Sequence, residues 1–464
     1  MKMLSLLLPL TAVSFFACDV ASDDHKGEKA DDPHNESVAL ALQRESHRTQ
    51  PDYIAYVPKS FDYSTNDSHN EHFLVFEGPD KSLMTVWTQA VCRGKNGNRN
   101  RIVFSKSPDN GITWENPRHL VGPKSCADST HIASWAFPLI SDSGRIYVVY
   151  NRNIGVKGWI YFHTGIMEGI YSDDRGVTWS EPQQIPMQKS IYDDPEGKIP
   201  SEWIVWQTPS KDLNGNYFVG YSRWINPAKA QLTELKGWTS IESVVEFMRF
   251  TNIHDNPEPA NIRIEYSAWG ENALKVPHYK YPQISIAQEP SIIRLPDERL
   301  FCVMRTNSGY IWYSTSQDDG KTWCNPRPLL REDHGEPILQ PVSCSPIYSL
   351  SDGHYILLHH NNRGDESLNF VGPRYPAFIA LGEFRPDADQ PVWFSRSKVL
   401  MDSEGFGPDG VKSSNNNNVG VYTSFTTIDG NNVLWHPDRK FYLLGKKITK
   451  AFLDDLAVPA EEAL

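Results

Sequence analysis

Paired apolar runs, each pair joined by a tight turn, recur along most of this chain. Alternating or continuous apolar stretches of strand length flank turns that carry Asp, Gly or Asn, which is the pattern of a β-hairpin. Six such units occupy residues 73–87, 135–150, 203–221, 290–304, 345–360 and 423–436. Their spacing is too long for repeats of one hairpin and suits four-stranded blades. We therefore predict an all-β chain, folded over residues 51–464 as a six-bladed β-propeller.

A second repeat supports this prediction. The pattern Ser-x-Asp-x-Gly-x-Thr-Trp occurs at residues 107–114, 172–179 and 316–323, each time after a strand-like run. In such a turn the Asp accepts hydrogen bonds from turn amides, and the Gly supplies a positive φ. We interpret Asp109, Asp174 and Asp318 as structural residues rather than catalytic acids.

The N-terminus differs from the rest of the chain. Lys2 precedes an apolar run at residues 3–17, which is too short for a permanent transmembrane helix, and we interpret residues 1–17 as a signal peptide. Cys18 follows directly, where a lipoprotein signal places the cysteine that becomes acylated. Plain secretion after cleavage nearby is the alternative. We expect residues 18–50, which are acidic and polar, to form a flexible tether, and we expect an exported bacterial protein, either secreted or held as a periplasmic or outer-membrane lipoprotein.

Charge and composition narrow the function. The chain has 464 residues, with 57 acidic and 45 basic side chains and a formal net charge of −12. An excess of acidic residues disfavours nucleic-acid binding. There is no Gly-rich phosphate loop or dinucleotide fingerprint, so we expect no cofactor. We expect a monomer that meets a membrane only through a lipid on Cys18.

Five further cysteines, an odd number, argue against complete disulfide pairing. They are Cys92, Cys126, Cys302, Cys324 and Cys344. No tight ligand spacing such as CxxC occurs, so we expect no metal site and interpret these cysteines as small buried apolar residues.

The turn motif and the six hairpins resemble the sialidase (neuraminidase) superfamily of six-bladed propellers, over about residues 53–449. In that family a Glu polarises a Tyr that attacks the anomeric carbon. The resemblance implies these roles for Glu289, in Gln288-Glu289-Pro290-Ser291, and for Tyr422, in Val421-Tyr422-Thr423-Ser424. A neutral phenol needs a neighbouring carboxylate to accept its proton as it attacks.

The family also binds the substrate carboxylate with three arginines, whose planar guanidinium groups form paired hydrogen bonds. Arg305 matches the second, and Arg374 is our candidate for the third, with Arg363 as its competitor. The first is missing, because the chain reads Glu71-His72-Phe73-Leu74 where the family has Arg-Ile-Pro.

The resemblance also fails at the family's general acid, an Asp before the first turn motif. Residues 88–101 contain no acidic side chain. We considered Asp128, His131 and His163 as replacements, each of which is an ordinary loop or core residue in the alternative interpretation.

Several side chains lie at the ends of predicted strands, where a propeller directs them towards its central mouth. We expect Arg152, Arg223, Trp135 and Trp203 to bind substrate, although some of them will pack between blades instead.

Three functions fit these observations. The first is a retaining glycosidase of the sialidase type that removes an anionic sugar from a glycan. The second is a polysaccharide lyase acting on uronates, because some ulvan-cleaving lyases are propellers that use His, Tyr and Arg. The third is a glycan-binding lipoprotein without catalytic activity. We favour the first.

Overall fold

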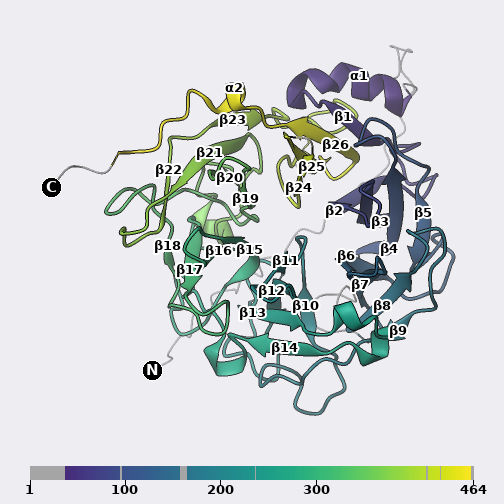
Figure 1. The fold of residues 1–464 in the computed structure, drawn as a ribbon, viewed down its shortest axis with the longest axis horizontal. Coiled ribbons are helices and arrows are strands. Elements are labelled where there is room, and N and C mark those ends of the chain that lie inside the picture. Colours follow the sequence, from purple (N-terminus) through teal and green to yellow (C-terminus); the bar gives the residue numbers. More distant parts are fainter. Residues whose placement is uncertain are drawn as a thin grey trace, which may run out of the picture. The chain divides into compact units, whose positions relative to one another are not determined.

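The computed structural model describes residues 37–94, 97–156, 165–235, 237–413, 416–428 and 430–460. These residues form six antiparallel sheets arranged as a ring around a central axis (Figure 1). The predicted six-bladed β-propeller is therefore confirmed. The predicted signal peptide and Cys18 lie outside the described residues, and no helix within the described part of the chain is long and apolar enough to cross a membrane.

The first three blades follow one another along the chain. Blade I contains β2 (His69–Glu77), β3 (Leu83–Gly94), β4 (Gly97–Ser107) and β5 (Arg118–Val121). Blade II contains β6 (Ala133–Ile140), β7 (Ile146–Arg152), β8 (Ile166–Ser172) and β9 (Gln183–Gln184). Blade III contains β10 (Glu202–Ile204), β11 (Ser210–Lys211), β12 (Tyr217–Trp224), β13 (Ser243–Phe250) and β14 (Ile264–Ser267).

The other three blades complete the ring. Blade IV contains β15 (Gln288–Arg294), β16 (Leu300–Arg305), β17 (Trp312–Ser316) and β18 (Arg327–Pro328). Blade V contains β19 (Ile347–Ser349), β20 (Tyr355–His359), β21 (Ala377–Phe384), β22 (Val392–Phe394) and β23 (Lys398–Met401). Blade VI contains β24 (Ser424–Ile428), β25 (Asn431–Asp438), β26 (Tyr442–Lys447) and, from the other end of the described chain, β1 (Tyr53–Tyr56). Strand β1 pairs with β26, so the ring is closed by hydrogen bonds between the two ends.

Helices are few and short among the residues that the structure describes. These residues form the α-helices α1 (Val38–Thr49) and α2 (Lys450–Leu453). They also form the 3-10 helices η2 (Ile253–Asp255), η3 (Pro259–Asn261), η4 (Gly270–Asn272) and η5 (Glu366–Leu368).

The Ser-x-Asp-x-Gly-x-Thr-Trp motifs join the third and fourth strands of blades I, II and IV. In the first of them, Asp109 accepts hydrogen bonds from the Thr113 amide (2.8 Å) and the Thr113 hydroxyl (2.6 Å), and the same bonds recur at Asp174 and Asp318. The tryptophan of the motif packs on the preceding blade, as Trp323 does on Phe247 with ring centroids 4.3 Å apart. These aspartates are therefore structural, as predicted.

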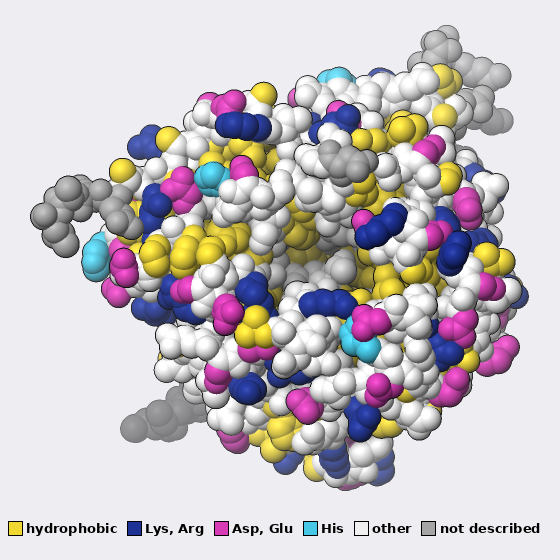
Figure 2. Space-filling model, viewed as in Figure 1, with side chains coloured by type: hydrophobic (Ala, Val, Ile, Leu, Met, Phe, Trp, Pro, Cys, Tyr) yellow, Lys and Arg dark blue, Asp and Glu magenta, His cyan; other side chains and the backbone are white. Residues whose placement is uncertain are grey.

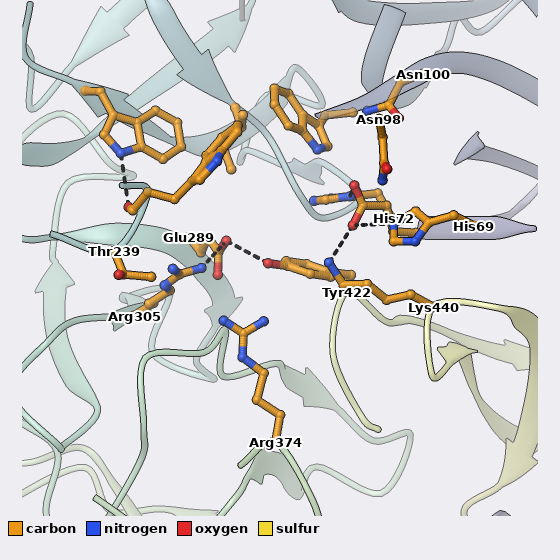
Figure 3. Close-up of a pocket in the computed structure, with 15 residues that line it drawn as sticks. His69, His72, Asn98, Asn100, Thr239, Glu289, Arg305, Arg374, Tyr422 and Lys440 are labelled. Carbon is orange, nitrogen blue, oxygen red and sulfur yellow. Dashed lines mark hydrogen bonds and ion pairs between the residues drawn. The ribbon is translucent and has the colours of Figure 1, made fainter. Parts of the chain in front are cut away.

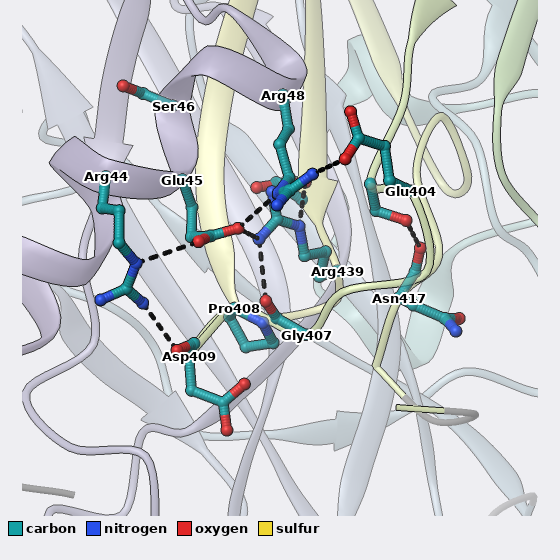
Figure 4. Close-up of polar contacts among 12 residues, drawn as sticks. Arg44, Glu45, Ser46, Arg48, Glu404, Gly407, Pro408, Asp409, Asn417 and Arg439 are labelled. Atoms are coloured by element: carbon teal, nitrogen blue, oxygen red, sulfur yellow. Dashed lines mark hydrogen bonds and ion pairs between the residues drawn. The ribbon is translucent and has the colours of Figure 1, made fainter. Parts of the chain in front are cut away.

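Helix α1 corrects the expectation of a flexible tether through residue 50. Ser37 caps this helix by accepting a hydrogen bond from the Leu40 amide, and Val38 and Leu42 pack against Phe441, Tyr442 and Leu444 of blade VI. The helix also buries Glu45, which lies close to the fully buried Arg439 (Figure 4). Residues 38–49 contain few apolar side chains, and these are buried by residues of blade VI that lie about four hundred positions later in the sequence. The local sequence pattern therefore could not predict this packing.

A disulfide corrects the interpretation of two cysteines as ordinary buried residues. Cys92, near the end of β3, is bonded to Cys126 in the loop before β6. Cys302 and Cys344 are free and buried, and Cys324 is free and exposed.

Candidate active site

The inner strands of several blades converge on a central pocket of about 370 Å³. Figure 2 shows one face of the ring, which is hollowed near its centre and bordered by basic and hydrophobic side chains. Fifteen residues line the pocket: His69, Glu71, His72, Asn98, Asn100, Trp135, Ile204, Trp224, Trp238, Thr239, Glu289, Arg305, Arg374, Tyr422 and Lys440. A volume near the lower end of the range for ligand sites suits a single sugar unit.

Five of these residues share an unusual backbone conformation. His72, Trp135, Glu289, Tyr422 and Lys440 all have positive φ, with values of 52°, 55°, 45°, 52° and 53°. The first three sit at β-bulges, where the register of β2, β6 and β15 shifts against the neighbouring strand. A bulge re-aims a side chain, and a positive φ is uncommon for a residue other than glycine. Such conformations persist where the surrounding structure enforces them, often at functional sites.

At three of these residues, the backbone amide donates a hydrogen bond to a side chain of the preceding blade. The Glu289 amide donates a hydrogen bond to Ser222 Oγ in β12 (2.7 Å), and the Trp135 amide donates one to Thr88 Oγ1 in β3 (2.7 Å). The Tyr422 amide donates to Cys344 Sγ at 3.4 Å. Contacts between blades therefore set the orientation of residues in the pocket.

Tyr422, Glu289 and Arg305 form a buried chain of hydrogen bonds (Figure 3). Tyr422 Oη donates to Glu289 Oε1 at 3.1 Å, and Arg305 Nη1 donates to the same oxygen at 2.6 Å. All three side chains are at least nine-tenths buried. The three residues that the resemblance singled out thus lie together, with the phenol pointing at the carboxylate.

The electrostatics of the pocket keep the carboxyl of Glu289 ionised and the phenol of Tyr422 protonated. Burial alone would raise the pKa of Glu289, but Arg305 and, to a smaller extent, Arg374 bring it below its ordinary value. Burial and the charge on Glu289 raise the pKa of Tyr422. In the resting pocket Glu289 is therefore a carboxylate and Tyr422 a neutral phenol.

Arg374, the proposed third arginine, also lines the pocket, and its Nη2 donates to the Val342 carbonyl at 2.7 Å. Arg363, its competitor, instead packs over the rings of Tyr310 and Phe370. The geometry favours Arg374 of the two.

A group of charged and titratable residues beside the ring of Tyr422 was not predicted. Lys440, in the turn between β25 and β26, donates to Glu71 Oε2 at 2.6 Å, and its Nζ lies 4.9 Å from the ring centroid of Tyr422. The ring of His72 stacks on Tyr422 with centroids 4.2 Å apart, and His69 Nε2 lies 3.6 Å from Glu71 Oε2. Glu71 and His72 stand in the segment where the sequence departs from the family, and that departure was the available signal.

Tryptophans form an apolar wall of the pocket. Trp238 meets Trp135 and Trp224 edge to face, with ring centroids 5.6 and 5.4 Å apart. Indole faces bind the apolar faces of sugar rings. Trp135 thus lies where it was expected, whereas Trp224 and Trp238 were not predicted.

The expected replacements for the general acid do not line this pocket. Asp128 is exposed at its carboxylate and accepts hydrogen bonds from the amides of Lys124 and Thr130, which lower its pKa, so it organises a loop. His131 is also exposed, in the strand-free segment before β6. His163 lies outside the described residues. The structure therefore does not support the expectation that Asp128 or His131 replaces the general acid.

Three predicted substrate-binding residues are held elsewhere. Arg152 pairs with Glu168 at 2.6 Å, and Arg223, fully buried, pairs with Glu246 at 2.6 Å and Asp193 at 2.7 Å. Trp203 is completely buried and donates to the Gly165 carbonyl. These side chains stabilise the blades, which corrects the expectation that they face the mouth.

No group of three or more His, Cys, Asp and Glu residues in the described part of the chain is arranged to hold a metal ion. The described residues that line the pocket offer carboxylates, guanidinium groups, an ammonium, imidazoles, a phenol, indoles, side-chain amides and a hydroxyl.

Comparison with known proteins agrees with this architecture. The chain is similar to a Hadza microbial sialidase (TM-score 0.55, 16% identity, covering 84% of this chain and 67% of that one). It is similar to the NanB sialidase of Streptococcus pneumoniae (TM-score 0.56, 12% identity, 88% and 71%). It is also similar to the intramolecular trans-sialidase of Ruminococcus gnavus (TM-score 0.57, 14% identity, 86% and 97%). At these identities the likeness shows a shared fold. No curated protein matches the sequence.

A family match extends over most of the propeller. Residues 82–423 match the BNR repeat-like domain, a span that includes the three Asp-containing turn motifs, Glu289, Arg305 and Tyr422. With the six blades and the central pocket in view, this chain belongs to the BNR repeat-like family and has a propeller of the sialidase type.

Proposed function

We propose that this protein is a retaining glycosidase that removes a terminal anionic sugar from a glycan. The observation that carries the proposal is the hydrogen bond from Tyr422 Oη to Glu289 Oε1, made at 3.1 Å inside a pocket that also contains Arg305 and Arg374. Structural neighbours that are themselves named sialidases support it.

The chemistry has two steps. In the first, Tyr422 Oη forms a bond to the anomeric carbon, the glycosidic C–O bond breaks, the phenolic proton passes to Glu289, and the leaving oxygen takes a proton from a general acid. In the second, water attacks the same carbon and gives one proton to the base that the first step produced, the Tyr–carbon bond breaks, and Glu289 returns its proton to Tyr422. Each step inverts the anomeric centre, so the configuration is retained overall. A neutral nucleophile also avoids repulsion by a carboxylate on the substrate.

The charges of the pocket favour an anionic substrate. Arg305, Arg374 and Lys440 line it together with the carboxylates Glu71 and Glu289. Each carboxylate has a cationic partner, Glu71 with Lys440 and Glu289 with Arg305. Arg374 bonds a backbone carbonyl through Nη2, and a guanidinium has further donors to offer a substrate carboxylate.

The test is to incubate the protein with sialylated and uronate-containing oligosaccharides and to measure product masses. We expect release of one acidic sugar with addition of one water, and loss of turnover by at least about 10³-fold in Tyr422→Phe. Tyr221→Phe is a matched control, because Tyr221 is another buried tyrosine bonded to a glutamate, Glu246, but lies outside the pocket lining. Full activity in Tyr422→Phe would refute the proposal.

β-Elimination is a second candidate, favoured by one observation. Burial lowers the pKa of His72 to about 4, so a neutral imidazole stacks on Tyr422 beside the pocket arginines. A neutral imidazole can remove the proton next to a uronate carboxylate while a phenol protonates the leaving oxygen. The products then have an unsaturated end and together lack the mass of the added water, so the same mass measurement separates the two reactions.

Export remains part of the proposal. We infer from residues 1–17 and Cys18 that the protein is exported and held at a membrane by a lipid, and that it acts as a monomer on external glycans. Incorporation of labelled palmitate into the full chain but not into Cys18→Ser tests the anchor.

A further inference from the structure

His72 is a buried polar side chain without a hydrogen-bond partner. It is 3% exposed, and neither ring nitrogen forms a hydrogen bond with any described residue. Buried polar groups are almost always hydrogen-bonded, and an unpaired one costs about 1–3 kcal/mol. The residue nevertheless lines the pocket.

The backbone groups His72 with the proposed catalytic residues. It shares a positive φ with Glu289 and Tyr422, and like Glu289 it sits at a bulge of the innermost strand of its blade. His72 therefore reaches the pocket through the same backbone conformation as the proposed nucleophile and its carboxylate.

The proposed reaction still lacks a proton donor for the leaving oxygen. Among the described pocket residues, Glu289 is engaged with Tyr422 and Arg305. Burial would raise the pKa of Glu71, but Lys440 holds it well below its ordinary value, so Glu71 stays ionised. The remaining candidates with suitable chemistry are His69 and His72, and only His72 stacks on the ring of the nucleophile.

We propose that His72 is the acid and base that transfers the second proton of this reaction. This inference rests on the proposed glycosidase function. In the first step Nε2–H of His72 gives its proton to the glycosidic oxygen as the C–O bond breaks. In the second step the neutral ring takes a proton from the attacking water, which restores the starting state.

Glu71 is the positioning residue of this pair. Its Oε1 lies 3.9 Å from His72 Nδ1, and Lys440 holds its other oxygen at 2.6 Å. A carboxylate on the Nδ1 side stabilises the imidazolium, and the proposed donor is the other ring nitrogen, Nε2, as in other catalytic pairs in which a third group orients the base. The groups facing His72 are Glu71, Lys440, Glu289, His69 and Tyr422.

Burial keeps the ring neutral in the empty pocket, because it lowers the pKa of His72 to about 4. A substrate carboxylate raises the pKa of a nearby imidazole by favouring its charged form. The imidazole of His72 therefore takes up a proton when the substrate binds, and this imidazolium is the proton donor.

The test separates acid catalysis from a structural role by changing the leaving group. The probes are the oligosaccharide cleaved by the wild-type protein and the 4-nitrophenyl glycoside of the released sugar, whose leaving group departs without a proton. His72→Asn is the first variant because Asn tolerates positive φ, and His72→Gln is the second. We expect oligosaccharide kcat/KM to fall about 10²- to 10⁴-fold in both, with formation of the glycosyl-enzyme from the aryl glycoside far less affected.

Azide provides an independent readout, because it attacks the glycosyl-enzyme without a base. We expect azide to speed turnover of the aryl glycoside by the His72 variants and to give a glycosyl azide, detected by mass. His69→Gln tests the neighbouring imidazole and should show neither effect. His131→Gln, an exposed histidine outside the pocket lining, should match the wild type.

The outcomes distinguish the two proposals. If the wild-type protein is active and Tyr422→Phe is inactive, but the folded His72 variants lose both substrates by the same factor without azide rescue, this inference is wrong. It is equally wrong if His69→Gln or His163→Gln shows the leaving-group dependence instead. If Tyr422→Phe keeps full activity, the proposed function itself fails.

Discussion

Tyr422 donates its phenolic hydrogen to Glu289 across 3.1 Å, although 133 residues separate the two in the chain. Two other Tyr–Glu–Arg groups occur in the blades: Tyr150 with Glu168 and Arg152, and Tyr221 with Glu246 and Arg223. These two groups do not line the central pocket. We therefore base the proposed reactivity of Tyr422 and Glu289 on their position in the central pocket and not on the combination of residue types.

Ser222 should matter to catalysis although it does not line the pocket. Its hydroxyl accepts the hydrogen bond of the Glu289 amide at 2.7 Å, at a residue with positive φ. We expect Ser222→Ala to lower kcat about tenfold with a smaller change in KM, because the carboxylate loses its support. The measurement is steady-state kinetics on the cleaved oligosaccharide, with Ser222→Thr as the variant that keeps the hydroxyl. An unchanged kcat in a folded Ser222→Ala protein would contradict this role.

Arg374 should bind the carboxylate of the substrate. We expect Arg374→Ala to raise KM by about 10- to 100-fold, the effect of losing a charge-assisted hydrogen bond. The loss should vanish for a substrate whose carboxylate is a methyl ester. Arg363→Ala is the matched control, because that guanidinium packs on Tyr310 and Phe370 and does not line the pocket.

The disulfide should stabilise the folded protein. It closes a segment with a sequence separation of 34 residues between Cys92 and Cys126. In the chain-entropy account this contributes about 3–4 kcal/mol to the free energy of unfolding. Cys92→Ser should therefore lower Tm, and a reductant should destabilise the wild type but not the variant. Cys324→Ser, at an exposed free cysteine, should leave Tm near the wild-type value.

Stability should fall in weak acid because of buried histidines. His436 is fully buried, neither ring nitrogen bonds a described residue, and burial lowers its pKa to about 3. Below about pH 6.5 the unfolded chain binds a proton that the native His436 does not, so the free energy of unfolding falls as pH falls. By pH 5 this one ring costs about 2 kcal/mol. Denaturant unfolding from pH 7.5 to 5 should show a shallower pH dependence in His436→Gln, and an equal slope would contradict the assignment.

Glu45 should anchor α1 to blade VI. Its carboxylate accepts from Arg48 at 2.8 Å and lies 3.3 Å from the fully buried Arg439 (Figure 4). Removing one partner of a buried ion pair costs about 3–5 kcal/mol, so Glu45→Gln should markedly lower the denaturant midpoint. Glu404→Gln, which removes an exposed partner of Arg48, should change stability by at most about 1 kcal/mol.

The fold could be predicted because its signals are local and repeated. Each hairpin has its own apolar runs and turn, and each Asp-containing motif carries its own hydrogen bonds within eight residues. The closure of blade VI by β1 and the burial of α1 were not predicted. Both depend on contacts with residues such as Tyr442 and Leu444, almost four hundred positions away in the chain.

The site was predicted where residues match a family motif and missed where they depart from it. Glu289, Arg305, Arg374, Tyr422 and Trp135 were placed in one pocket. Glu71, His72 and Lys440 were not, because their proximity arises from a bulge in β2 and from the turn after β25, which no sequence pattern announces. That Asp128 and His131 lie outside the pocket lining was not predicted either.

The pairing of β1 with β26 has a consequence for biosynthesis. Strand β1 leaves the ribosome almost four hundred residues before its partner β26. Tyr422 lies just before the first strand of blade VI, so a polypeptide that stops before β26 lacks the strand pairing that closes the ring. We therefore expect the proposed cleaving activity only in chains that extend through β26.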